Sequence, residues 1–200
     1  MDCKQSYLEK AYNILHGCRQ ILQESDWTFD SNIGDVRLEK KYYPQCSIPY
    51  YKCSALASNK NPDELFSKVW DVDEAKMKSI DKEIESWKII ESGENFRVVL
   101  QRNNLPWPIY PRETIIVQAS MHEANENWFV TYSLDDHPLA PKNSNYVRAK
   151  IHLNCFGFVK QGNDTIIHKQ TLVDPCGMIP SFVITNYSHK MVNMVNYIRE

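Results

Sequence analysis

The sequence lacks the composition that several common classes of protein require. It has no excess of one charge, since 23 lysines and arginines balance 25 aspartates and glutamates to a formal net charge of −2. Proteins that bind nucleic acid rely on a concentrated basic surface, so we expect no nucleic-acid partner. No segment rich in glycine, serine or proline marks a linker, and 200 residues suffice for one substantial core. We therefore predict a single domain over residues 1–200.

Targeting and membrane-spanning signals are also missing. The N-terminus has no uninterrupted apolar segment of the kind that forms a signal peptide or a membrane span. Asp2 stands where N-myristoylation needs glycine, and the ending Ile198-Arg199-Glu200 is no prenylation signal. The six cysteines contain no CxxC pair, which is typical of free thiols in a reducing compartment. We expect a soluble, cytoplasmic protein.

Motifs for catalysis, nucleotides and metals are absent too. None of the patterns GxxxxGK[ST], GxGxxG or GxSxG occurs, and the six histidines are dispersed without a close pair. The adjacent Asp135, Asp136 and His137 belong to an expected turn, where such side chains normally face water. We predict no metal, no cofactor and no enzymatic activity.

The stretch from Val173 to Glu200 is the most distinctive part of the chain. It begins with the turn residues of DPCGMIP, and Pro180 suits a helix start because its missing N–H is not needed there. Beyond it, apolar side chains recur at three- and four-residue steps on one helical face: Val183, Tyr187, Met191, Met194, Val195 and Ile198. Methionines make such a face adaptable to a changing ligand, although an ordinary core helix explains the pattern equally well.

Most of the remaining chain alternates in polarity as strands do. Helices are expected from Ser6 to Gln23 and, as two short pieces, from Asn61 to Asp81, while Trp27 and Phe29 are expected in a loop. The expected strands are 35–43, 48–56, 85–91, 95–103, 112–121, 127–134, 146–160 and 164–173. Consecutive strands closed by a helix predict an antiparallel sheet in an α+β domain.

The segment LPWPIYP, residues 105–111, interleaves three prolines with large apolar side chains. Proline cannot donate to a strand ladder, so this segment is predicted to be a loop, and loops normally lie on the surface. Its apolar residues Leu105, Trp107, Ile109 and Tyr110 either pack against a neighbour or enter a membrane interface, where Trp and Tyr rings settle. Both interpretations stay open from this stretch alone.

Four motifs resemble those of the START family, lipid-binding domains related to the steroidogenic acute regulatory protein. Residues 174–180, DPCGMIP, resemble the family's DPxGxIP signature before its C-terminal helix. Pro111, Arg112 and Glu113 resemble the Arg-Asp step after the first omega loop, with Glu in place of Asp. Residues 147–149 resemble its VRA strand, and residues 70–81 resemble a helix ending in Lys-Trp-Asp, with Ile80 in place of Trp. In order and spacing, these matches cover nearly the whole chain.

The resemblance implies a helix-grip fold, in which a curved antiparallel sheet encloses a tunnel roofed by the long C-terminal helix and the omega loop. It implies a monomeric, non-enzymatic protein that encloses one lipid, with phospholipid favoured over ceramide or a sterol, and carries it between membranes. Each methylene left in water costs roughly 0.8 kcal/mol, so a long acyl chain favours enclosure over an open groove. Leu105, Trp107, Ile109 and Tyr110 would then contact the membrane transiently. The alternatives are a lipid-sensing interaction module and, less favoured, a helix-grip enzyme using His152 or Asp135.

Strand parity predicts the tunnel lining once the resemblance fixes which face looks inward. The predicted ligand-binding residues are Arg97, Val99, Gln101, Thr114, Ile116, Gln118, Arg148, His152 and Phe156 from the sheet, with Ser120 on the same face, and Val183, Tyr187 and Met191 from the helix. Because a buried Arg without a partner is costly, Arg97 or Arg148 should meet a carboxylate of the protein, at the sheet rim, or the phosphate of a ligand.

The chain departs from the family patterns that recognise particular head groups. Met77 occupies the position of an Arg that members similar to the phosphatidylcholine transfer protein use, and Gln101 and Thr114 replace expected aromatic residues. Val99 and Gln118 align with the charged pair of sterol-type members. We therefore expect neither a choline cage nor a sterol pair, and favour a phospholipid with broad head-group tolerance.

Overall fold

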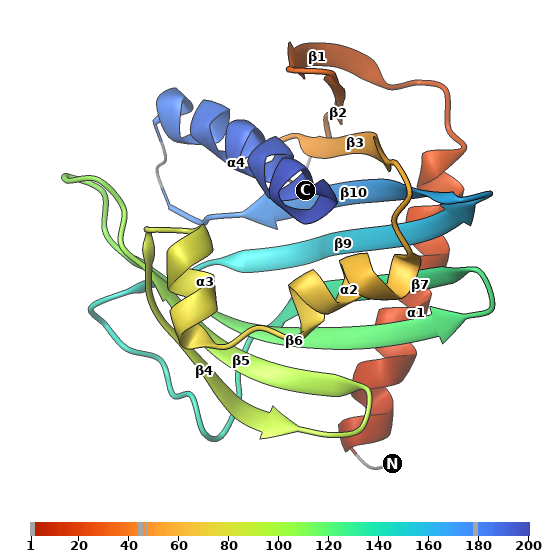
Figure 1. Ribbon diagram of the computed structural model, residues 1–200. Coiled ribbons are helices and arrows are strands. Elements are labelled where there is room, and N and C mark those ends of the chain that lie inside the picture. Colours follow the sequence, from red (N-terminus) through yellow and green to blue (C-terminus); the bar gives the residue numbers. More distant parts are fainter. Residues whose placement is uncertain (1–2, 44–45, 47, 178–179) are drawn as a thin grey trace.

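A computed structural model describes residues 3–43, 46, 48–177 and 180–200, and the strands of this part form one curved sheet (Figure 1). The strands are β1 (Thr28–Ile33), β2 (Val36–Lys41), β3 (Tyr50–Ala57), β4 (Ile84–Ser92), β5 (Phe96–Asn103), β6 (Arg112–Glu123), β7 (Glu126–Leu134), β8 (Val147–Arg148), β9 (Lys150–Gln161) and β10 (Asp164–Asp174). Their order is β1-β2-β3-β10-β9-β7-β6-β5-β4, antiparallel throughout, and β8 pairs in parallel with β6.

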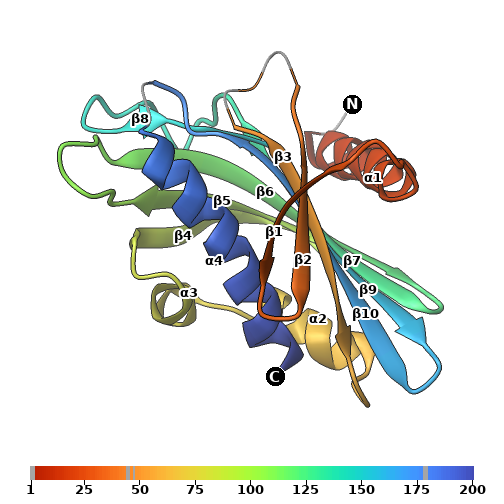
Figure 2. The same cartoon turned by 90° about the horizontal axis from the view of Figure 1, so that it is seen from above.

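Helices cover both faces of this sheet, as Figure 2 shows from above. They are α1 (Cys3–Leu22), α2 (Pro62–Trp70), α3 (Glu74–Ile80) and α4 (Ser181–Arg199). Two helices begin at residues whose side chains cap the first turn. The Asn61 side chain accepts from the Asp63 backbone N–H at the start of α2, and the Asp73 side chain accepts from the Lys76 N–H at the start of α3. Pro180 stands at the start of α4, as the sequence predicted.

The two faces of the sheet bury different sets of residues because alternate side chains of a strand point to opposite sides. On β6, Ile115, Val117 and Ala119 pack outward with Ala11 and Leu15 of α1. The intervening residues face α2, α3 and α4, which lie together on the other side of the sheet (Figure 2). The site described below lies on this second, concave side.

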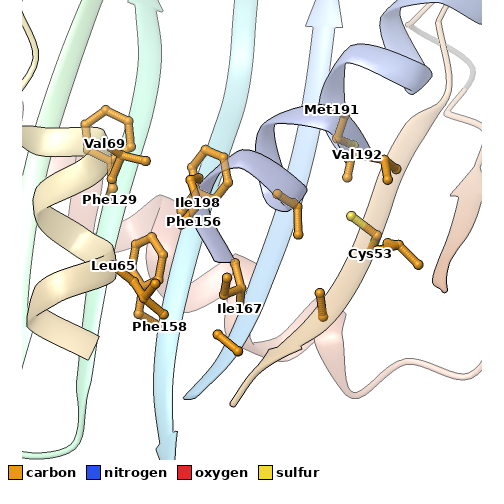
Figure 3. Packing of buried hydrophobic residues seen from close by; sticks show 14 of the residues in the cluster. Cys53, Leu65, Val69, Phe129, Phe156, Phe158, Ile167, Met191, Val192 and Ile198 are labelled. Carbon is orange, nitrogen blue, oxygen red and sulfur yellow. The ribbon is translucent and has the colours of Figure 1, made fainter. Parts of the chain in front are cut away.

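The concave side has a solid part and a hollow part. In Figure 3, Leu65 and Val69 of α2 meet Phe158 and Phe129 of the sheet, and Met191 and Val192 of α4 lie near Cys53 of β3. Ile198 near the end of α4 is fully buried in the same cluster. This packing fixes α4 against β3 and β10 and against α2, while its N-terminal end lies at the end of the sheet near β8 (Figure 2).

Two predictions of local structure are wrong. Residues 28–33, expected in a loop, form the edge strand β1; it pairs with β2 through a turn in which Gly34 has a φ of +63°. Its residues are mostly exposed or half-buried, so no clean polar–apolar alternation marks the strand. The single strand expected over 146–160 is split, because residues 147–148 leave the β9 direction and pair in parallel with β6.

Candidate ligand-binding cavity

A cavity of about 560 Å³ lies between the concave face of the sheet and α4. This volume is typical of sites that enclose one small molecule, which usually occupy roughly 300–1,000 Å³. Its lining is mainly apolar, with contributions from Val69, Met77, Ile84, Ile116, Phe129, Ile151, Phe156, Met191 and Met194. The cavity is therefore suited to a largely apolar ligand.

A row of polar side chains crosses the floor of this apolar cavity. Gln118 on β6 is the Cα partner of Thr131 on β7, and Thr131 is the partner of Asn154 on β9. Lys169 on β10 continues the row by donating to the Asn154 Oδ1. All four line the cavity, and we call Gln118, Thr131, Asn154 and Lys169 the polar stripe. It depends on the register of β6, β7 and β9 and on the side-chain hydrogen bond from Lys169 of β10.

Lys169 is the most unusual member of the polar stripe. Its side chain is buried, with 4% of the residue exposed, and its Nζ lies 3.8 Å from the centroid of the Phe156 ring. This burial lowers the pKa of Lys169 to about 7, and the groups that oppose the shift are the thiols of Cys155, Cys53 and Cys18. Among the described residues, no carboxylate forms an ion pair with it, so its charge is uncompensated.

Arg97 lies outside the cavity and contacts the polar stripe at Gln118. Its guanidinium lies between the rings of Trp70 and Trp87, 4.8 and 4.9 Å from their centroids, and its Nε donates to Gln118 Oε1 at 2.6 Å. Burial lowers the pKa of Arg97 to about 10. The predicted carboxylate partner is not found for Arg97 within the described ranges, and two aromatic faces stand in its place.

Seven of the predicted ligand-binding residues line the cavity: Gln101, Thr114, Ile116, Gln118, Phe156, Tyr187 and Met191. Tyr187 also exchanges a 2.7 Å hydrogen bond with the Thr171 hydroxyl, which connects α4 to the floor. Val99 is fully buried beside Ile116 and does not reach the cavity surface, and Ser120 lies beyond it, bonded to the Asn95 carbonyl. The side chain of Val183 lies outside the described residues, as does Ile179 of the DPxGxIP motif.

His152 is exposed and does not line the cavity, contrary to the parity prediction. The cause is a register shift: Leu172 pairs with Leu153 but Val173 pairs with Ile151, so His152 is an extra residue in β9. This bulge reverses the alternation at one end of β9 and turns Ile151 inward instead. Asp135, the other residue considered for catalysis, has a side chain 77% exposed and pairs with Lys150.

Arg148 also does not line the cavity. It forms an ion pair with a carboxylate of the protein, which was the alternative to binding a ligand phosphate. Its Nη2 donates to Glu113 Oε1 at 2.9 Å, while Arg102 Nε donates to the other carboxylate oxygen at 3.0 Å. Glu113 is 1% exposed, so two arginines compensate one buried carboxylate. This pairing also explains why β8 lies beside β6.

The loop between β5 and β6 lies at the cavity, at the same end of the sheet as the N-terminal end of α4 (Figures 1 and 2). Leu105 and Pro106 line the cavity, whereas Trp107 is 93% exposed and Tyr110 is 66% exposed. Ile109 is half-buried. One side of the loop therefore forms part of the cavity wall, and the exposed rings of Trp107 and Tyr110 lie outside the cavity.

Arg112 connects this loop to the turn before α4. Its guanidinium donates to the carbonyl of Tyr110 at the end of the loop and to those of Pro175 and Cys176 in the turn. Gly177 follows with a φ of +71°, a conformation that favours glycine and so accounts for this position of the DPxGxIP motif. One buried side chain thus holds both segments that border the cavity.

Sequence reasoning missed three residues of the polar stripe, Thr131, Asn154 and Lys169. A signal was present for Lys169, which shares its parity on β10 with the fully buried Ile167 and with Thr165 and Thr171. A lysine at a buried strand position is rare enough to indicate a specific role. The two neutral residues offer no comparable signal.

A curved antiparallel sheet that encloses a cavity beneath a C-terminal helix defines a helix-grip ligand-binding domain. The family model of the START domain matches residues 19–199, which is most of the chain. This protein belongs to the START domain family, and membership implies lipid binding. The fold and the family predicted from the sequence are thus confirmed.

Solved structures show the same fold. Human StAR-related lipid transfer protein 5 superposes with a TM-score of 0.81 at 14% identity, covering 98% of this chain and 96% of that one. Human STARD10 gives 0.76 at 17% identity, covering 92% and 76%, and a STAR-related lipid transfer protein of Xanthomonas axonopodis gives 0.71 at 13%, covering 88% and 97%. At such identities the likeness shows the fold alone. A sequence search of curated proteins found no match.

Proposed function

We propose that this protein encloses one lipid in its cavity and transfers it between membranes. The observation that carries the proposal is the 560 Å³ cavity, largely apolar, between the sheet and α4 in a START domain. An apolar chain held there is removed from water, at roughly 0.8 kcal/mol for each buried methylene. Phospholipid is the class that the sequence favours, and the polar stripe supplies the chemistry by which a head group is chosen.

Exposed aromatic rings support contact with a membrane surface. Trp107 and Tyr110 project from the loop whose other side, through Leu105 and Pro106, forms part of the cavity wall. Insertion of these rings into the interface would place the cavity wall next to the lipid. In the part of the chain that the structure describes, no helix is long and apolar enough to cross a bilayer. Membrane contact through this loop would be peripheral and transient.

Lipid that co-purifies with the protein, identified by mass spectrometry after extraction, tests the binding half of the proposal. We expect about one lipid per protein chain, and a preparation that neither retains lipid nor takes it up from vesicles would contradict the proposal.

Transfer between donor and acceptor vesicles tests the other half. The double substitution Trp107→Asp and Tyr110→Asp should slow transfer severalfold while leaving the unfolding temperature unchanged, since both side chains are largely exposed. Tyr12→Asp is the matched control, because Tyr12 is an aromatic residue 56% exposed on α1, on the opposite face. Equal transfer rates for all three proteins would remove the membrane role of the loop.

A further inference from the structure

We propose that the polar stripe binds the anionic group of the lipid, a carboxylate or a phosphate, and that Lys169 supplies the opposite charge. This inference rests on the proposed function and specifies the class of ligand: a lipid with a negatively charged group that enters the cavity head first, in preference to a neutral one. The argument depends on which hydrogen-bonding groups the cavity leaves unused.

The charge of Lys169 has no carboxylate counterpart among the residues that the structure describes. Its side chain is buried in the cavity floor, its hydrogen bond goes to the neutral amide oxygen of Asn154, and the groups that act electrostatically on it are thiols. The carboxylates that line the cavity, Asp81 and Glu83, are both paired with Lys190, at 3.0 and 2.6 Å. A buried cation left this way is costly, and a ligand anion would remove the cost.

The other cations in the cavity lining already have partners. Arg112 donates to three backbone carbonyls, and Lys68 donates to the Ile198 carbonyl at 3.0 Å. Lys190 is paired as described above. Lys68 and Lys169 each make one hydrogen bond among the described residues, but Lys68 is only half-buried, whereas Lys169 is 4% exposed.

The neutral members of the polar stripe offer donors, because their acceptors are occupied. Gln118 Oε1 accepts from Arg97, and Asn154 Oδ1 accepts from Lys169, so the amide oxygen of each residue is already used. Their amide N–H groups have no acceptor among the hydrogen bonds of the described residues. An array of donors beside a cation is the chemistry that recognises an anion.

Thr131 is a second, independent indication of a missing partner. The residue is 2% exposed, it lies between Gln118 and Asn154 in the row, and its Oγ1 has no hydrogen-bond partner among the described residues. A buried hydroxyl without a partner normally costs about 1–3 kcal/mol. The hydroxyl proton is free to rotate toward an acceptor that occupies the cavity. A ligand oxygen over the polar stripe would satisfy it.

The depressed pKa of Lys169 agrees with this geometry. In protein without a bound anion, Lys169 is only partly charged near pH 7. An anion close to Nζ would favour the protonated amine and raise the pKa again. Binding of an anionic lipid should therefore be accompanied by proton uptake near pH 8, where the empty site is mostly neutral.

The test compares three ligands with the same sixteen-carbon chain, hexadecanoic acid, hexadecyl phosphate and hexadecan-1-ol, by titration calorimetry on protein stripped of lipid. Each anionic ligand should bind about 10- to 100-fold more tightly than the alcohol, the range that a hydrogen-bonded charge gives. Acetate and inorganic phosphate, which carry the anion without the chain, should bind far more weakly.

Variants of the polar stripe make the result specific. Lys169→Met should abolish the preference for the anions and leave the alcohol affinity within about twofold, and Thr131→Val, which keeps the shape, should weaken only the anions. Lys82→Met, at an exposed lysine, removes the same charge and should keep the wild-type preference.

Each outcome decides between the two proposals. Equal binding of acid, phosphate and alcohol by the wild type would overturn the anion site and leave the lipid carrier standing, whereas failure to bind any of the three would overturn both. Inorganic phosphate binding as tightly as hexadecyl phosphate would assign the stripe to free anions and overturn the inference. If Lys169→Met did not fold, an unchanged preference in Thr131→Val would be decisive against it.

Discussion

Replacing Lys169 by methionine should stabilise the lipid-free protein, although it removes a hydrogen bond. Methionine has nearly the length of the lysine stem and suits an apolar cavity, so the substitution changes charge far more than shape. In the folded protein the ammonium is buried with no carboxylate partner among the described residues, and in the unfolded chain it is solvated. Folding therefore has to desolvate or deprotonate Lys169, and the methionine variant avoids both.

The size of the effect follows from the pKa. A fall from the ordinary value of 10.5 to about 7 corresponds, at 1.36 kcal/mol per unit, to about 5 kcal/mol as an upper limit at pH 7. The variant also leaves the Asn154 Oδ1 without its donor, at a cost of about 1–3 kcal/mol. A net gain of about 2–4 kcal/mol in the free energy of unfolding remains, which for a chain of this length raises Tm by roughly 5–15 °C.

The pH dependence of the free energy of unfolding provides a second test of this prediction. Below pH 7 Lys169 is charged in both states, so the full penalty is present; above pH 7 the folded protein loses a proton that the unfolded chain keeps. The stability of the wild type should therefore rise with pH, by up to about 1.4 kcal/mol per unit, between pH 7 and about pH 8.5. Above that window the raised pKa values of the buried thiols Cys53 and Cys155 oppose the rise.

Urea unfolding of delipidated protein at pH 7 and at pH 8.5 measures both effects. The methionine variant should unfold at higher urea with an unchanged m-value, and its advantage over the wild type should shrink at the higher pH. Lys82→Met should differ from the wild type by less than about 0.5 kcal/mol at both values. A destabilised Lys169→Met, or an advantage independent of pH, would refute the view of Lys169 as an uncompensated buried cation.

Two other predictions concern buried groups that do have partners. Glu113→Gln should lower the free energy of unfolding by about 3–5 kcal/mol in urea titrations, because it leaves two part-buried arginines without their shared carboxylate. Glu123→Gln, which removes an exposed pair with Arg19, should cost less than about 1 kcal/mol, and equal losses would contradict this reading of Glu113. Arg112→Met should accelerate release of a fluorescent lipid severalfold, because it frees the β5–β6 loop from the turn before α4; an unchanged release rate would show that Arg112 does not restrain the opening.

The parity of the central strands could be predicted from the sequence because those strands are regular. Gln101, Thr114, Ile116 and Gln118 line the cavity on β5 and β6, which pair residue by residue without a shift. The same rule is wrong for His152, where one extra residue in β9 reverses the alternation. A bulge is a property of the pairing between two strands, and the sequence of one strand does not reveal it.

The polar stripe was beyond sequence reasoning for a related reason. Its members are far apart in the chain: the register of β6, β7 and β9 aligns Gln118, Thr131 and Asn154, and Lys169 joins them from β10 through its side-chain hydrogen bond to Asn154. Gln118 was among the predicted ligand-binding residues, whereas for Lys169 the only signal was its parity with Thr165, Ile167 and Thr171 on β10. The role of Lys169 follows from its burial, and the sequence does not show which elements cover that face of β10.

Comparison of Glu113 with Lys169 separates a structural charge from a functional one. Both are buried, but Glu113 is held by two arginines and would gain nothing from a ligand. Within the described part of the chain, Lys169 is opposed by no carboxylate and adjoins a cavity and an unpaired hydroxyl, a cost that a bound anion would offset.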